Sequence, residues 1–467
     1  MILLSTSFAV SKANAQSSPY GDIAVSFASV DNLQEPGFRF LIALENQGDE
    51  ALPPSGWELY FSMMRMLDTA QVPAVVRVEH INGGFYRITP NTEFRALEPG
   101  GRLVLPLVGD AMAIKHGDAP RGFYFVVNDE RIPLGEVDVA PFVHDAQTLR
   151  SAEDRLPVPT PASRYESDAV LSVLDGDAVT PITPTPVQYD PLEGTWALDA
   201  RTVVEYEAGL EREARFLVDA LEAAIGARPE TVEGGGHTGG IALRVDEDLG
   251  GESYTLVVEP ERGVGIVGGD AAGVFYGIQS LRALLPVAAY RAPRPRIELR
   301  AVRVQDEPGF GYRGMMLDVS RNFQPAESVR RLLDVMSLYK LNHLHFHLTD
   351  DDGWRLEIDG LPELTAVGGR RGHTLDEREH LIPSFGSGPF PDELPGSGFY
   401  TREEYMDLLR YAAERHITVI PEIDVPGHAR AAIVAMEARY HNLSEQGDEQ
   451  AAGEFRLNDP HESSTYR

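Results

Sequence analysis

Hydrophobic and polar residues alternate in short runs over the first third of the chain, a pattern typical of strands with one buried face. Asn82-Gly83, the favoured sequence of a two-residue hairpin turn, separates two of these runs. Short strands joined by turn residues predict a β-sandwich over residues 19–157. Trp57, Tyr60 and Phe61 are expected in its core, with sugar binding as the alternative. The predicted strands span residues 23–30, 38–45, 57–62, 73–81, 85–89, 103–108 and 123–127.

A proline-rich segment over residues 158–181 follows, and its composition predicts a stiff linker. Residues 182–306 then mix strands with two amphipathic helices, which predicts a small α/β domain. The first helix is expected to end at Gly226. The apolar positions of the two helices are Leu217, Leu221 and Ala224, and Val274, Ile278, Leu281 and Leu285.

Gly263–Gly268 matches the G-x-G-x-x-G fingerprint of dinucleotide-binding proteins. The match is poor, because these glycines lie within a predicted strand instead of the turn after one. No acidic residue stands about twenty positions later to hold a ribose. No nucleotide cofactor is therefore expected here.

Residues 307–467 alternate strand and helix. Strands are predicted over residues 312–319, 341–348 and 417–423. Helices are predicted to begin at Pro325, at Thr401, where Glu404 completes a capping box, and at Gly427. Repeated strand–helix units predict a parallel sheet, either open or closed into a (β/α)8 barrel.

Charge and composition narrow the possible partners. The chain holds 72 acidic and 41 basic residues, a formal net charge of −31. Such a charge repels nucleic acid and anionic membrane surfaces, so neither is expected as a partner. With no cysteine, the sequence excludes disulfides, thiolate nucleophiles and cysteine-ligated zinc.

The first fifteen residues resemble a secretory signal. A short apolar stretch is followed by Ala13-Asn14-Ala15, the A-x-A pattern of a cleavage site, although a basic n-region is missing. No later segment approaches the ~20 uninterrupted apolar residues that a membrane span needs. The sequence thus predicts an exported protein, periplasmic or extracellular.

Charged side chains gather after each of the three predicted parallel strands. The segments concerned are residues 318–322, 349–355 and 421–428, and Arg313 opens the first strand. Active sites of α/β barrels and open parallel sheets lie at the carboxyl ends of their strands. Carboxylates, an arginine, a histidine and Trp354 at these ends are typical of a sugar site, with charged groups for hydroxyls and an aromatic wall for the ring.

His343, His345 and His347 alternate along the second strand, so all three are expected on one face. Imidazoles at i and i+2 can share a divalent cation, which leaves a metal-dependent hydrolase as an alternative. Polar packing inside a barrel is the other interpretation of this row.

Three long motifs in the same order resemble glycoside hydrolase family 20, the β-N-acetylhexosaminidases and chitobiases. They are Tyr312-Arg313-Gly314-Met315-Met316-Leu317-Asp318-Val319-Ser320-Arg321-Asn322-Phe323, Leu341-Asn342-His343-Leu344-His345-Phe346-His347-Leu348-Thr349-Asp350-Asp351, and the run from Pro421 to His428. The run from Gly273 to Leu281 is similar to the small domain that precedes the barrel in that family. The first region resembles the sandwich of the bacterial chitobiase branch.

The resemblance implies a substrate and roles for four residues. Substrates would be N-acetylhexosaminide oligosaccharides, hydrolysed with retention and with help from the substrate's own acetamido group, without cofactor or metal. Arg313 would clamp sugar hydroxyls at the pocket floor, and Asp350 would support the catalytic acid. Asp424 and His428 would form a charge relay behind the catalytic residues. The structural alternatives are an Arg313–Asp424 salt bridge and packing of His428 at a helix start.

The catalytic Asp-Glu pair of the family follows its fourth barrel strand, in a His-x-Gly-Gly-Asp-Glu context that this sequence lacks. A full barrel takes about 250 residues, so residues 307–467 are expected to form about three units of an incomplete barrel. The pair is expected beyond Arg467, and this chain alone is expected to be an inactive fragment. A carbohydrate-binding module without catalysis is the alternative. The sequence does not indicate an oligomeric state.

Overall fold

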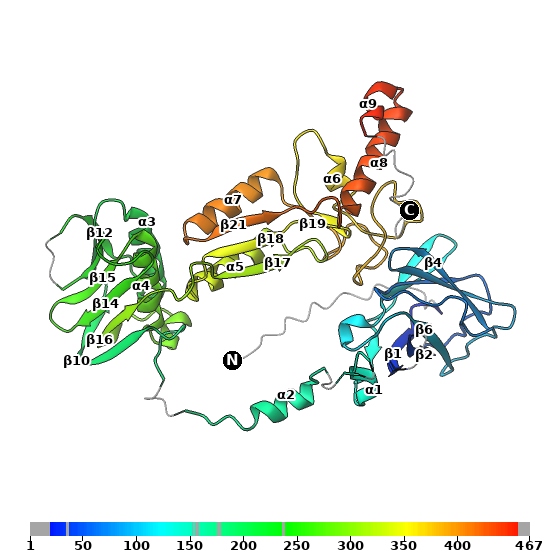
Figure 1. Cartoon of the computed structure of the whole chain (residues 1–467), viewed down its shortest axis with the longest axis horizontal. Helices are drawn as coiled ribbons and strands as arrows, with labels where there is room; N and C mark the ends of the chain where they lie inside the picture. The colour runs from blue at the N-terminus through cyan, green and yellow to red at the C-terminus, as the bar shows by residue number, and fades with distance from the viewer. Residues whose placement is uncertain are drawn as a thin grey trace.

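The computed structural model describes residues 19–33, 37–151, 153–154, 158–174, 179–235 and 239–455. The predicted signal segment, residues 1–15, lies outside them. Figure 1 shows three folded bodies in chain order: a blue-to-cyan β domain, a green mixed domain and a yellow-to-red domain. Among the described residues, no helix is both long and apolar enough to cross a membrane.

The N-terminal domain consists of two sheets, one with the strand order β6-β2-β1-β9 and one with the order β4-β5-β3-β7-β8. Each of the seven predicted strands is present, because alternating apolar side chains fill the space between the sheets. Trp57 and Phe61 belong to that core, whereas Tyr60 is buried in a second, smaller cluster. The strands are β1 (Ile23–Asp31), β2 (Phe38–Asn46), β3 (Glu58–Ser62), β4 (Val76–Asn82), β5 (Phe85–Pro90), β6 (Arg102–Gly109), β7 (Arg121–Val127), β8 (Glu130–Pro133) and β9 (Asp138–Val139).

The segment predicted as a stiff linker contains a helix, α2 (Pro161–Asp168). The Thr160 side chain caps it by accepting a hydrogen bond from the Ser163 amide at 3.1 Å. Pro161 occupies the first helical position, where its missing N–H is no loss. No residue of α2 is buried. A shorter helix, α1 (Asp145–Thr148), precedes it.

The middle domain is a seven-stranded sheet in the order β10-β16-β14-β15-β13-β11-β12. Helices α3 (Glu211–Ile225) and α4 (Ala271–Ala283) pack on it and on each other. Gly226 ends α3 in the left-handed conformation, as predicted, with φ 76°. The fingerprint-like glycines form β15 itself. The strands are β10 (Gln188–Asp199), β11 (Val203–Tyr206), β12 (Glu230–Glu233), β13 (Ile241–Val245), β14 (Tyr254–Glu259), β15 (Gly263–Gly268) and β16 (Arg296–Asp306).

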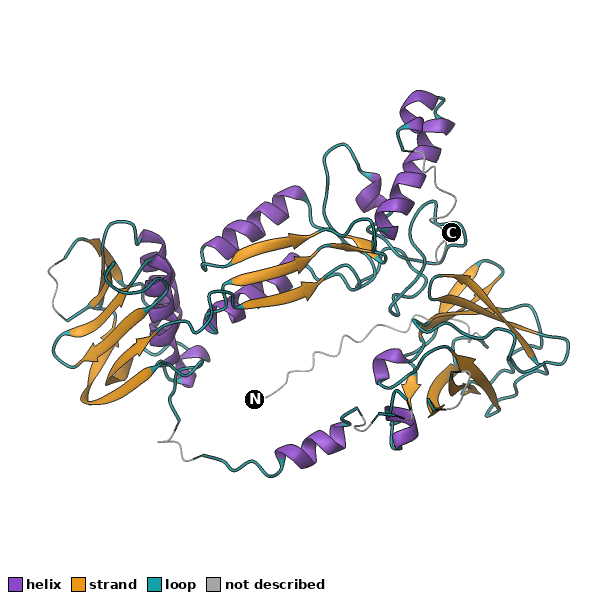
Figure 2. Cartoon of the chain, in the orientation of Figure 1, coloured by secondary structure: helices purple, strands orange, loops and turns teal. Residues whose placement is uncertain are grey.

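The third domain is built on three parallel strands, β17 (Gly314–Asp318), β18 (His343–His347) and β21 (Thr418–Glu422). Figure 2 shows them side by side with their arrowheads at the same end. Helices α5 (Ala326–Leu338) and α7 (Arg402–Ala413) share a hydrophobic core with β18. Three strand–helix units are thus present, and completion into a barrel stays a prediction.

Short elements follow the carboxyl ends of these strands. A small hairpin pairs β19 (Thr349–Asp350) with β20 (Gly353–Trp354). Helix α6 (Glu363–Ala366) packs against α8 (Arg430–Glu445), which is followed by α9 (Glu449–Gly453). The long loop between α6 and α7 has no helix or strand of its own.

Candidate functional site

The carboxyl ends of the three parallel strands lie level with one another. Asp318 of β17 is in register with His347 of β18, and His347 is in register with Glu422 of β21. The residues that follow each strand therefore meet at a single edge of the sheet.

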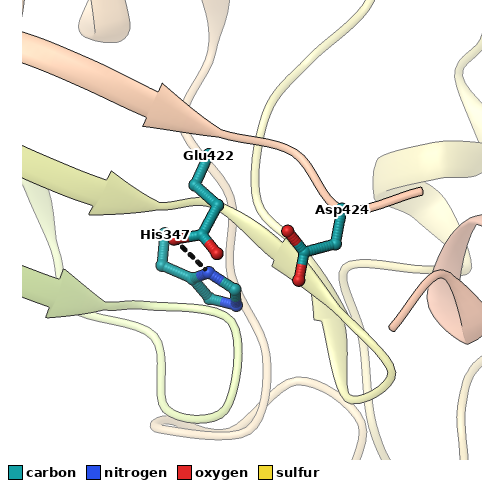
Figure 3. A group of neighbouring side chains, drawn as sticks. All are labelled: His347, Glu422 and Asp424. Carbon is teal, nitrogen blue, oxygen red and sulfur yellow. Dashed lines mark ion pairs between the residues drawn. The ribbon is translucent and has the colours of Figure 1, made fainter. Parts of the chain in front are cut away.

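His347 is a buried titratable residue of this edge, only 2% exposed. Its Nε2 lies 2.9 Å from Asp350 Oδ2, and its Nδ1 lies 2.8 Å from Glu422 Oε2. Figure 3 shows the His347 ring joined to the Glu422 carboxylate by a dashed line, with the Asp424 carboxylate to one side of them. Burial lowers the pKa of His347, but the interactions with Glu422 and Asp350 outweigh burial and raise this pKa above 6.5. Burial raises the pKa of Glu422, but its contacts with His347 and His345 outweigh burial and lower this pKa.

Arg321 adds a fixed positive charge to this cluster. Its guanidinium donates to Asp318 Oδ2 at 2.7 Å, lies 2.9 Å from His347 Nε2 and forms an ion pair with Asp350. Burial lowers the pKa of Arg321, but the carboxylates of Asp318 and Asp350 outweigh it and raise this pKa. The Asp350 carboxylate is 2% exposed, whereas the Arg321 side chain is 27% exposed. Arg321 thus connects a buried carboxylate to solvent.

The strand-three segment completes the edge. His428 Nδ1 lies 3.1 Å from Asp350 Oδ1. Asp424 reaches the same region, because its backbone N–H donates to Thr349 Oγ1 at 3.2 Å. The structure therefore brings three of the four predicted site residues together: Asp350, Asp424 and His428.

Arg313 lies at the opposite end of the sheet. Its guanidinium forms an ion pair with Glu252 of the middle domain, with Nη1 3.0 Å from Oε2, and donates to Tyr276 Oη at 3.0 Å. Arg313 was predicted to clamp sugar hydroxyls at the pocket floor, and this position does not fit a pocket at the carboxyl ends of the strands. The physical reason is that Arg313 precedes β17, and residues before and after a strand lie at its two different ends. The arginine at the carboxyl end is Arg321, and its position after the strand in the same motif could have predicted this.

Comparison with known proteins shows which family this chain is similar to. Three family models match successive parts of the chain: a "Putative carbohydrate binding domain" over residues 28–160, "Glycosyl hydrolase family 20, domain 2" over 179–307, and "Glycosyl hydrolase family 20, catalytic domain" over 310–465. The chain belongs to glycosyl hydrolase family 20.

Two relatives of this family 20 chain, both from Vibrio, are about twice as long as the part that it matches. The beta-hexosaminidase of Vibrio vulnificus is 37% identical over 456 residues, which cover 92% of this chain and 51% of that protein. The N,N'-diacetylchitobiase of Vibrio harveyi is 36% identical, and the match covers 91% of this chain and 47% of that protein. The chain thus spans about half the length of these curated relatives.

A solved structure supports the same assignment. The family 20 exo-β-N-acetylglucosaminidase from Vibrio harveyi, in complex with N-acetylglucosamine, superimposes with a TM-score of 0.68 at 28% identity. The superposition covers 89% of this chain and 59% of that structure.

The histidine row of the family 20 chain does not converge on one point. His343 packs against the Tyr312 ring, and its Nδ1 lies 2.6 Å from Asn342 Oδ1. Only His345 and His347 reach Glu422, His345 Nε2 at 2.5 Å from Oε2. The arrangement therefore does not support the alternative of a metal site built on this histidine row.

Two other groups of side chains at this edge have metal-ligand chemistry, His347–Glu422–Asp424 and Asp350–Asp351–His428. Several of their ligand atoms already contact one another directly, at 2.8 to 3.1 Å. Zinc ligands at ~2.1 Å from the metal would stand roughly 3.4 Å apart. The contacts observed are those of ion pairs, and a metal would have to replace them.

Arg355 supports the site from within the fold of the family 20 chain. Its side chain is completely buried, and burial lowers its pKa to about 9. Its five hydrogen-bond acceptors are all backbone carbonyl groups, and two of them belong to the residues immediately before Arg321. The acceptors are the carbonyl oxygens of Val319 (3.0 Å), Ser320 (2.6 Å), Gly369 (2.9 Å), Gly396 (3.0 Å) and Gly398 (3.0 Å).

Proposed function

We propose that this chain forms the N-terminal part of a β-N-acetylhexosaminidase and contributes one side of its sugar site. The observation that carries the proposal is the cluster of Arg321 and His428 on the Asp350 carboxylate, at the carboxyl ends of three parallel strands. Active sites of βα folds lie at that end. The family match and the names of the relatives support the choice of N-acetylhexosamine as substrate.

The residues of the cluster suit recognition of a neutral sugar. A guanidinium held by carboxylates presents fixed N–H donors to hydroxyl oxygens, and a buried carboxylate accepts from hydroxyl groups. In this proposal, Arg321 takes the role that the sequence motif had suggested for Arg313. Asp350 accepts from a sugar hydroxyl while Arg321 and His428 hold its charge.

The reaction proposed is hydrolysis of a terminal N-acetylhexosamine, with retention and assistance from the acetamido carbonyl, which attacks the anomeric carbon. An Asp-Glu pair outside residues 1–467 would orient the acetamido group and protonate the leaving oxygen. The half-length coverage of the relatives and the missing His-x-Gly-Gly-Asp-Glu run support this division. The A-x-A pattern at residues 13–15 supports export as its cellular context.

Two measurements test this proposal. The 467-residue chain should not release p-nitrophenol from p-nitrophenyl N-acetyl-β-glucosaminide, and measurable turnover would contradict the placement of the catalytic pair. N-acetylglucosamine should nevertheless cause amide chemical-shift changes in the 318–322 and 349–352 segments. The variant Arg321→Gln, which weakens binding, should require a higher sugar concentration to produce those changes.

A further inference from the structure

The loop between α6 and α7 is seated on the N-terminal domain. The ring of His373 lies edge-on to Tyr60, with centroids 4.7 Å apart, and its Nδ1 lies 2.9 Å from Tyr124 Oη. Ile382 of the same loop joins Tyr60, Phe85 and Tyr124 in a buried hydrophobic cluster. In Figure 1, this loop approaches the blue-to-cyan domain near β4.

One carboxylate in this loop has partners in both domains. Glu377 is 8% exposed, with a φ of 54°, which few residues other than glycine adopt. Its Oε2 accepts from Asn82 Nδ2 of the N-terminal domain at 3.0 Å. Its Oε1 accepts from the Ile382 backbone N–H at 2.9 Å and forms a buried ion pair with Arg430.

Arg430 carries this connection into the candidate site. It is the first residue of α8, two residues after His428, and its backbone N–H donates to Asp351 Oδ1 at 3.1 Å. The Asp351 N–H in turn donates to Asp350 Oδ1 at 2.7 Å, the oxygen that also contacts His428. A continuous series of polar contacts therefore runs from Asn82 to Asp350.

We infer that Glu377 is a positioning residue, through which the N-terminal domain holds Arg430, and with it the start of α8, so that His428 meets Asp350. The significance for sugar binding rests on the proposed function, whereas the positional effect does not. Removing one partner of a buried ion pair weakens the hold on the other. The Arg430 side chain would keep its contact with the Asp351 carbonyl oxygen, at 3.4 Å, but the first turn of α8 would be held less firmly.

The Arg430 amide is the direct reporter of this effect, because Asp351 protects it from exchange with solvent. In Glu377→Gln of the full chain, hydrogen exchange at Arg430 should accelerate about tenfold, and in Asn82→Ala about threefold. Amides within α5 and α7 should keep their rates. The double variant should be no faster than Glu377→Gln alone, since both changes act on one connection.

Matched controls are Glu379→Gln in the same loop and Asn91→Ala in the N-terminal domain, both at exposed positions. Neither should alter exchange at Arg430. An unchanged Arg430 rate in Glu377→Gln, or equal acceleration throughout the chain, would overturn the inference. Affinity for N-acetylglucosamine is measured in parallel and should fall in Glu377→Gln. A wild-type chain that binds no sugar would count against the proposed function alone, since the exchange result does not depend on sugar.

Discussion

Arg313 and Arg321 flank the five-residue strand β17, and only Arg321 forms an ion pair with Asp350. Arg313 pairs instead with Glu252 of the middle domain. The two arginines of one sequence motif therefore serve different ends of the sheet, one for domain packing and one for the candidate site.

Replacing each arginine by glutamine should separate these two roles. Arg321→Gln should weaken N-acetylglucosamine binding about tenfold or more, because a charge-assisted donor is lost. Arg313→Gln should leave the affinity nearly unchanged but cost about 2 kcal/mol of unfolding free energy, since Glu252 loses its partly buried partner. NMR titration and denaturant unfolding measure the two effects. An equal loss of affinity in both variants would contradict the assignment.

His347 should make the chain less stable as the solution becomes alkaline. Its pKa is raised above 6.5 in the folded protein, so its stabilising interactions are fully present below pH 6.5 and are lost as the pH rises through the raised value. The melting-temperature difference between wild type and His347→Gln should therefore shrink above pH 6.5, by about 2 °C or more. His441→Gln, at an exposed position, is the control. If the melting-temperature difference varies between about pH 5 and about pH 9 by no more than the experimental error, this role is refuted.

His373 should have the opposite dependence on pH. Burial, helped by Arg131, lowers its pKa to about 4, so the unfolded chain takes up a proton more readily than the folded one. Stability should fall as the pH drops from about 6.5 toward 4, by up to roughly 3 kcal/mol from this residue. Denaturant unfolding of wild type and His373→Asn across that interval measures the contribution. The stability of the variant should not show this decrease at low pH. Identical pH profiles of wild type and variant would disprove the contribution of His373.

Arg355→Lys should be strongly destabilising although the charge is kept. A lysine ammonium has three donors and cannot reach five carbonyl oxygens at once, so buried acceptors lose their partners. We expect a loss of about 3 kcal/mol in denaturant unfolding. Arg370→Lys, whose side chain is 36% exposed and pairs with Asp392, is the matched control and should cost under about 0.5 kcal/mol. A similarly small cost for Arg355→Lys would show that the carbonyl contacts are dispensable.

Local sequence patterns predicted much of this fold because the elements concerned bury one regular face. The seven strands of the sandwich, the helix that ends at Gly226 and the helix that begins at Thr401 follow from alternation, amphipathic spacing and capping residues. Strands β8 and β9 were missed because they are too short for alternation to register. Helix α2 was not predicted because the proline-rich composition indicated a linker, although Thr160-Pro161 is a typical N-terminal sequence of a helix.

The site was only partly predictable for a different reason. Asp350, Asp424 and His428 follow strands, so their convergence follows from a parallel sheet. The contacts of Glu377 join residues far apart in sequence, 295 positions in the case of Asn82. No periodicity or motif predicts such a pair, because the residues around Glu377 and around Asn82 are equally compatible with an exposed loop.

The buried guanidinium of Arg355 also constrains its neighbour two residues earlier. A Cβ atom at Gly353 would lie 2.4 Å from Arg355 Nη2, and five hydrogen bonds prevent that group from moving aside. A side chain at position 353 is thus compatible only with a residue other than arginine at position 355. A combinatorial library that randomises both positions should therefore yield folded variants with a side chain at 353 only where 355 is no longer arginine. The two positions would covary among the folded variants because of one packing constraint.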